Sequence, residues 1–179
     1  MDVKDAYASY PDLATHPYKL ITHLMDNSEI VWKLLRYDDP DAWSKPNLTK
    51  AEKGALIYPG GENITDYRVF TDQGQSDVFT AENCVIRMGI HSIFQENRTV
   101  GTIYYVLEAF AHYKVNHLSN YTNRVDVITS EFIRVFNGAT LMGIGQMNMD
   151  RASNHNARME LGFTQPHRGR WLIMGVKSG

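Results

Sequence analysis

Three histidines raise the question of a metal site: His91, His112 and His117. The stretch that holds His112 and His117 alternates in the manner of a strand, and residues an odd number of positions apart on a strand point to opposite faces. A zinc pair on a helix needs a spacing of four, as in HExxH. The spacing therefore does not predict a metal site, and we expect polar or half-buried histidines.

Cys84 is the single cysteine, which excludes an internal disulfide and suits a reducing compartment. It opens an apolar run with Val85 and Ile86. A nucleophilic thiol needs a paired base, whereas a cysteine among apolar neighbours is a buried, inert side chain. We therefore interpret Cys84 as part of the core.

Glycine and aspartate patterns give no stronger indication of chemistry. Gly143-x-Gly145 lacks the third glycine and the following helix of a dinucleotide fingerprint. Gly60-Gly61 lacks the Lys-Ser/Thr of a phosphate loop. The aspartates around Pro40 surround a turn, where this residue is favoured. We expect no catalytic, cofactor-binding or metal-binding residues, no cofactor, and a protein that is not an enzyme.

The arginines near the C-terminus fall in polar stretches between expected strands; they are Arg151, Arg158, Arg168 and Arg170. A nucleic-acid surface clusters such charges with aromatic side chains. Trp171 is nearby, but it lies where the last strand needs an apolar residue. The net charge of −2 supplies no general attraction for phosphate. We expect loop charges that meet solvent or acidic residues of a neighbouring subunit.

Length and composition indicate a globular domain. A chain of 179 residues with 43% hydrophobic residues can bury a core. No apolar run approaches the roughly 20 residues of a membrane span, and the N-terminus lacks the pattern of a secretory signal. We expect a soluble protein made in a cytoplasm, with an arm over 1–16 and a single domain over 17–179.

The stretch 100–136 organises the domain. Alternate apolar residues over 100–118, from Ile103 to Val115, predict a long strand with one buried face. The spacing from Val125 to Phe136 predicts an amphipathic helix that ends at Asn137-Gly138. Residues 84–94 predict an antiparallel neighbour of the long strand, with Phe94 on its buried side.

The flanking segments complete an α+β fold with a mostly antiparallel sheet, one packed helix, N-terminal helices and a long loop. Helical spacing begins near Leu20 and ends before Pro40, with a cap at Asn27 or Ser28. Thr49 and Glu52 can cap a short helix. Residues 62–82 predict mostly loop, with a strand possible at 67–71. Strands are expected within 141–149, at 159–163 and at 170–178, the last two separated by 165–169.

The second face of the long strand is the main candidate interface. One helix and a short N-terminal pair cannot cover both faces of such a sheet, so Tyr104, Val106 and Phe110 are expected to meet another chain unless the N-terminal helices cover them. Tyr67 and Arg68 of the long loop, with Arg151, Arg158 and Arg168, complete the set of candidate interface residues.

Residues 28–49, SEIVWKLLRYDDPDAWSKPNLT, followed by Ile57-Tyr58-Pro59, resemble proteins of the neck, or head–tail connector, of tailed bacteriophages. The order of strands and helix from Cys84 onward is similar to that of tail-terminator proteins. The resemblance covers most of 20–176 and implies a structural virion protein, with no catalytic residues, that is assembled in the host cytoplasm and located in the neck or tail.

The same resemblance implies partners. These are further copies of the chain in a closed ring, a hexamer or a dodecamer, together with neighbouring neck and tail-tube proteins. Genomic DNA would pass through the channel without sequence-specific binding, and no membrane is involved. The arm and the long loop are expected to order on neighbouring rings.

Two alternatives to a tail-terminator or tail-completion ring stay open. One is a stopper or adaptor ring below the portal. The other, from a different class, is a small cytoplasmic enzyme or ligand-binding α+β domain.

Overall fold

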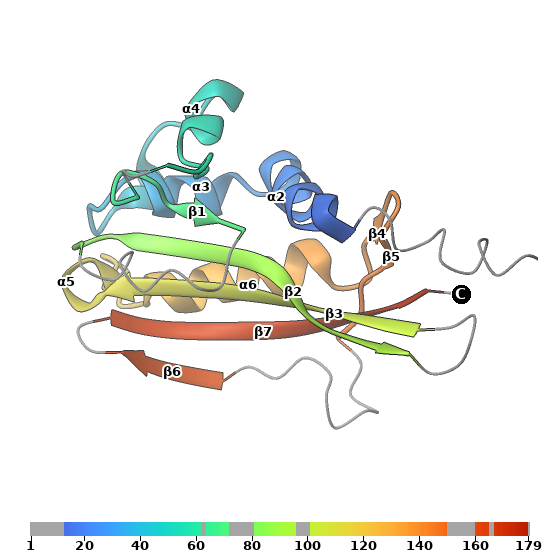
Figure 1. The fold of residues 1–179 in the computed structure, drawn as a ribbon. Coiled ribbons are helices and arrows are strands. Elements are labelled where there is room, and N and C mark those ends of the chain that lie inside the picture. The colour runs from blue at the N-terminus through green and yellow to red at the C-terminus, as the bar shows by residue number, and fades with distance from the viewer. Residues whose placement is uncertain are drawn as a thin grey trace, which may run out of the picture.

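A long sheet with helices on one side organises the chain (Figure 1). The computed structural model describes residues 13–61, 64–71, 81–95, 101–149, 160–164 and 167–178. The arm before residue 13, the expected loop at 151–157, and most of the long loop after Thr71 lie outside the described residues.

The main sheet has the strand order β1-β2-β3-β7-β6. Its strands are β1 (Val69–Phe70), β2 (Cys84–Gln95), β3 (Gly101–His112), β7 (His167–Ser178) and β6 (Glu160–Thr164). β2, β3, β7 and β6 pair antiparallel, and β1 joins β2 in parallel. The α+β class and the hairpin of β2 with the long strand are thereby confirmed.

Alternate side chains of β3 enter the core as predicted: Ile103, Tyr105, Leu107, Ala109 and Ala111 are each at most 2% exposed. The strand stops at His112, and the next residues form a helical turn, α5 (Tyr113–Asn116). The ring of His112 caps this turn by accepting a hydrogen bond from the backbone nitrogen of Lys114, at 3.3 Å. The predicted continuation of the strand to residue 118 is therefore wrong.

A bulge changes the face of the last residues of β2. Between Ile90 and Ser92 the register with β3 shifts by one residue. Such a shift inverts the alternation beyond it. Ile93 therefore continues the face of Ile90, and Phe94 is 62% exposed. The prediction that Phe94 lies on the buried side is wrong.

Three helices form a layer on one face of the sheet: α2 (His16–Asn27), α3 (Glu29–Arg36) and α6 (Arg124–Phe136) (Figure 1). α6 packs on β3 and β7, α2 packs on β2, and α3 packs on α6. The N-terminal helices thus share a face with α6. No helix of the described segments covers the opposite side, which we call the helix-free face.

The first residues of α3 and α2 are held by different contacts. Ser28 caps α3 by accepting a hydrogen bond from the backbone nitrogen of Val31 at 3.4 Å, as predicted. α2 begins at His16, whose ring lies 2.7 Å from the hydroxyl of Tyr105. The shorter helical segments are η1 (Leu13–Thr15), η2 (Ala42–Ser44) and α4 (Lys50–Ala55).

One buried arginine joins the N-terminal helices to the rest of the fold. Arg124 is 0% exposed and donates four hydrogen bonds of 2.5–3.0 Å to backbone carbonyls. The acceptors are Leu34, Tyr37, Asp39 and Val115. Because Leu34 lies in the last turn of α3 and Tyr37 and Asp39 follow it, Arg124 satisfies carbonyls that the helix leaves without internal donors.

Helix α6 ends where the sequence predicts, but the segment after it does not form the predicted single strand. Asn137 caps α6, and Gly138 has a φ of +82°, which glycine adopts at little cost. A small hairpin of β4 (Thr140–Leu141) and β5 (Gly145–Gln146) then replaces the single strand expected over 141–149. Gly143 turns it with a φ of +73°. The C-terminal hairpin also differs, since β7 begins at His167 inside the expected separator.

Candidate functional site

The structure separates the predicted interface residues into several locations. Tyr104, Val106 and Phe110 lie on the helix-free face, where Val106 and Phe110 are each 5% exposed within the subunit and Tyr104 is half-buried. Arg168 is exposed and pairs with Ala111, so its register places it on the face opposite to Phe110. Arg151 and Arg158 lie outside the described residues. The candidates therefore do not form one patch.

Two of the candidates do meet. Phe110 packs with Phe70 and Val85 in a small apolar cluster, and Tyr67 and Tyr58 pack against its edge. The rings of Tyr58 and Tyr67 make an edge contact with centroids 5.4 Å apart. Arg68, beside Tyr67, donates hydrogen bonds to nearby backbone carbonyls and so stabilises its own loop.

The helix-free face also holds an ion pair that the sequence analysis missed. Arg87 Nε lies 2.8 Å from Glu108 Oε2, and their side chains are 11% and 13% exposed. The guanidinium carbon of Arg87 also lies 4.9 Å from the ring centroid of Phe110. Burial raises the pKa of Glu108, although Arg87 opposes the shift. The sequence signal that could have identified this pair is an isolated charged residue in each strand of the predicted hairpin, positive in one strand and negative in the other.

Most of the large exposed apolar side chains of the described residues lie at the two ends of the sheet, and the exception is Tyr18 of α2, which is 64% exposed. Tyr113 and Tyr121 are 53% and 102% exposed, at the end where β3 leads into α5. Phe94 and Ile93, at 62% and 46%, lie where β2 turns back toward β3, and Met142, at 95%, lies in the β4–β5 turn at the same end (Figure 1). A strand the length of β3 separates the ends by roughly 40 Å.

Tyr121 combines exposure with an unfavourable backbone. Its φ of +64° is the only positive value at a non-glycine position among the described residues. The turn is held by a hydrogen bond from the Leu118 nitrogen to the Thr122 carbonyl at 2.9 Å and by another from the Ser119 nitrogen to the Pro40 carbonyl at 2.8 Å. A bulky residue in this conformation is strained, and an observed outlier of this kind supports a functional hypothesis.

A groove of about 760 Å³ runs between α2 and α4. One wall is the face of α2 that carries Tyr18, Thr22 and Met25. The other wall carries Lys50 and Gly54 of α4 and continues into the segment 57–59.

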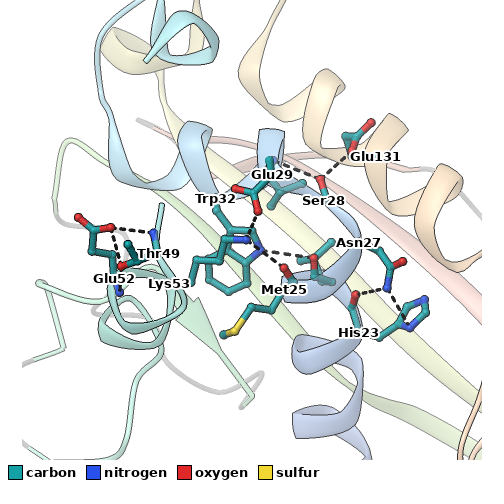
Figure 2. A network of polar contacts seen from close by, with 12 residues as sticks. His23, Met25, Asn27, Ser28, Glu29, Trp32, Thr49, Glu52, Lys53 and Glu131 are labelled. Carbon is teal, nitrogen blue, oxygen red and sulfur yellow. Dashed lines mark hydrogen bonds and ion pairs between the residues drawn. The ribbon is translucent and has the colours of Figure 1, made fainter. Parts of the chain in front are cut away.

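A polar network fixes α4 in this position (Figure 2). Lys53, 4% exposed, donates to the backbone carbonyl of Met25 at 3.0 Å and forms an ion pair with Glu29. Thr49 and Glu52 form the predicted capping box at the start of α4. Since Met25 and Glu29 flank the α2–α3 junction, the network makes the groove a feature of the folded subunit.

The same network reaches α6 through Ser28, whose hydroxyl donates to Glu131 at 2.7 Å (Figure 2). Arg134 pairs with Glu131 and donates to the backbone carbonyl of Asn27 at 2.8 Å. The ion pair with Arg134 and, after it, the hydrogen bond from Ser28 lower the pKa of Glu131.

The residues first considered for chemistry occupy structural positions. Cys84 is fully buried, and burial raises the pKa of its thiol to about 12. His112 contacts His167 with ring centroids 5.2 Å apart, and burial lowers the pKa of His167. Within the described segments, no group of three or more histidine, cysteine, aspartate or glutamate residues is placed to hold a metal ion.

No helix in the described parts of the chain is long and apolar enough to cross a membrane.

Comparison with known proteins assigns the chain to a family. No curated protein matches the sequence. The family model of YomW, a phage-derived family, matches residues 27–173, which include α3, α6 and almost all of the sheet. The chain therefore belongs to the YomW family.

Proposed function

We propose that the protein is a structural component of the neck of a tailed phage. In this role it forms a closed ring that joins the tail to the head, as a tail terminator or tail-completion protein. The phage-derived family supports the setting. The resemblance of residues 28–49 to neck proteins supports the more specific role.

The observation that carries the proposal is the pair of different apolar surfaces at opposite ends of the sheet. One end presents Tyr113 and Tyr121, and the other presents Ile93, Phe94 and Met142. A ring needs head-to-tail contacts in which each subunit offers two unlike surfaces to its neighbours. Large exposed apolar side chains are typical of such contacts and are uncommon as a group on a monomer.

The proposal also fits the charge of the chain. Tight binding of DNA requires clustered lysine and arginine that neutralise phosphates. With a net charge of −2, the subunit supplies no general attraction of this kind. A channel built from it would let genomic DNA pass without sequence-specific binding, while its protein partners are the neighbouring neck and tail-tube proteins.

Purified protein tests the proposal directly. We expect native mass spectrometry and negative-stain images to show a closed ring, and the ring to bind isolated tails. Binding to DNA-filled heads in place of tails would instead support a stopper or adaptor ring below the portal. A monomer that binds neither heads nor tails would contradict the proposal and favour a small enzyme or ligand-binding domain.

A substitution at Tyr121 separates assembly from folding. Asparagine tolerates a positive φ better than tyrosine does, so Tyr121→Asn should leave the subunit folded and at least as stable. Because the substitution removes the exposed aromatic side chain, we expect assembly of the subunits into a closed ring to weaken at least tenfold. Tyr121→Phe, which keeps an exposed aromatic side chain at the same position, is the matched control and should assemble like the parent.

A further inference from the structure

The groove between α2 and α4 contains a glycine that the described residues of its own subunit do not explain. Gly54 is exposed, lies within α4 and lines the groove. A side chain added at this position would meet nothing within 4 Å. Glycine destabilises a helix relative to alanine, and it is useful where another backbone approaches closely. Gly54 therefore indicates that a chain segment from outside the described subunit packs against this wall.

The path of the chain into α2 argues against the subunit's own arm as the occupant. η1 leads directly into α2, and Thr15 between them has a right-handed helical backbone, with φ −90° and ψ −14°. The chain therefore enters α2 without a reversal, and at Leu13 it points beyond the end of the helix. The groove lies alongside α2 and its lining starts at Ala14, so residues before Leu13 would have to reverse direction to fill the groove of their own subunit.

We infer that the groove receives residues 1–12 of a second copy of this chain. Twelve residues span up to about 40 Å when extended, whereas Tyr18 to Met25 covers about 11 Å along α2. The arm is therefore long enough to leave one subunit and fill the groove of the next.

The chemistry of the two surfaces matches. Of the residues described along the groove walls, Lys50 is cationic and none is acidic. The arm carries three aspartates against one lysine, and its tyrosines and proline suit the apolar walls; these residues are Asp2, Asp5, Asp12, Lys4, Tyr7, Tyr10 and Pro11. Opposite charges would orient the arm, and burial of the apolar side chains would hold it.

The first test measures binding of a labelled peptide of residues 1–12 to protein that lacks those residues. We expect Gly54→Gln, which adds a side chain to the groove wall, to weaken binding at least tenfold. The control is Ala51→Gln, at an exposed position of α4 that does not line the groove. Both variants should fold, since glutamine is a good helix former. Equal binding to the two variants, or no binding to the parent, would overturn the inference.

The second test distinguishes exchange between subunits from binding within one. Full-length Gly54→Gln has an arm but a blocked groove, and the arm-deleted protein has a groove but no arm. We expect their mixture to form a one-to-one complex in analytical ultracentrifugation. Neither protein alone should self-associate through this contact. A mixture that stays monomeric while the peptide still binds would overturn the inference, because the tethered arm would then not enter a neighbouring groove. A full-length parent that stays monomeric while the mixture associates would show that the arm occupies its own groove, and would overturn the inference as well.

The inference does not depend on the neck-ring proposal. Rings that assemble normally from arm-deleted subunits would overturn arm exchange and leave the neck ring intact. Arm-exchanged complexes that neither close into rings nor bind tails would overturn the neck-ring proposal and leave arm exchange intact.

Discussion

The two faces of β3 are built from the same strand but stabilised differently. On the helix-covered face, Leu107 and Tyr105 are fully buried among apolar residues of β2, β7 and the helices. On the helix-free face, Tyr104 and Glu108 are half-buried, and the ring of Phe110 lies so close to β7 that a Cβ on Gly169 would come within 2.3 Å of it. One face depends on a helical layer, and the other on side chains of the sheet together with Tyr58 and Tyr67 of the neighbouring loop.

Each side of the sheet contains a buried or nearly buried arginine, and the two arginines have different kinds of hydrogen-bond acceptor. Arg124, in the helical layer, donates to four backbone carbonyls that cannot change their protonation. Arg87, on the helix-free face, pairs with a carboxylate that can take up a proton. The helical layer should therefore tolerate substitution less well than the helix-free face.

The largest expected effect is the difference in stability between a charged substitution on each of the two faces of β3. Leu107→Asp places a carboxylate in the core, at a cost of several kcal/mol against a total stability of roughly 5–15 kcal/mol, so it should abolish folding. Tyr104→Glu, on the half-buried face, should leave a folded subunit. Circular dichroism melts would measure both. A Leu107→Asp protein that melts like its parent would contradict the assignment of the buried face.

Replacing each arginine by methionine should give the next largest difference. Arg124→Met leaves buried carbonyls without donors and should cost about 3–5 kcal/mol. Arg87→Met should cost about 1–2 kcal/mol, because Glu108 can become protonated. Urea denaturation gives both values, and the double variant Arg87→Met/Glu108→Leu should recover much of the smaller loss. Equal costs for the two arginines would remove the distinction between the faces.

Gly169→Ala tests the packing of the helix-free face alone. Its Cβ would collide with Phe110 and should cost about 1–3 kcal/mol. In a Phe110→Ala background the same substitution should cost less, so a double-mutant cycle should show coupling. Gly175→Ala, whose Cβ would lie 3.3 Å from the ring of Tyr104, is the milder control. An absence of coupling would show that Phe110 does not determine the need for glycine at 169.

The smallest expected effect is a difference in the sign of the pH dependence. The pKa of Glu131 in the helical layer is lowered, so its contribution is present above its ordinary value of 4.5 and is lost as the pH falls through the folded pKa. The pKa of Glu108 is raised, so its contribution is present below 4.5 and is lost as the pH rises through the folded pKa. Glu131→Gln should flatten the stability profile below pH 4.5, and Glu108→Gln should flatten it above. Unfolding free energies from pH 3 to pH 7 would measure both slopes, and equal slopes would contradict the assigned environments.

Local sequence patterns determined the features that depend on near neighbours in the chain. The alternation along β3 and the helical spacing of α6 predicted their buried faces, because each period follows from backbone geometry. Ser28 and the pair of Thr49 and Glu52 predicted helix starts, because a cap needs only its own first turn.

Tertiary structure decided what depends on residues far apart in the chain. Nothing in the local pattern placed α2 and α3 on the same face as α6 or introduced the bulge that moves Phe94 to the other face. The partners of Arg124 lie up to 90 positions away, and the pair of Arg87 with Glu108 requires the register of two strands. The groove likewise arises where α2 meets α4, held by Lys53 across the α2–α3 junction. Periodicity specifies which side of an element is apolar, and only the packed arrangement of elements specifies what that side meets.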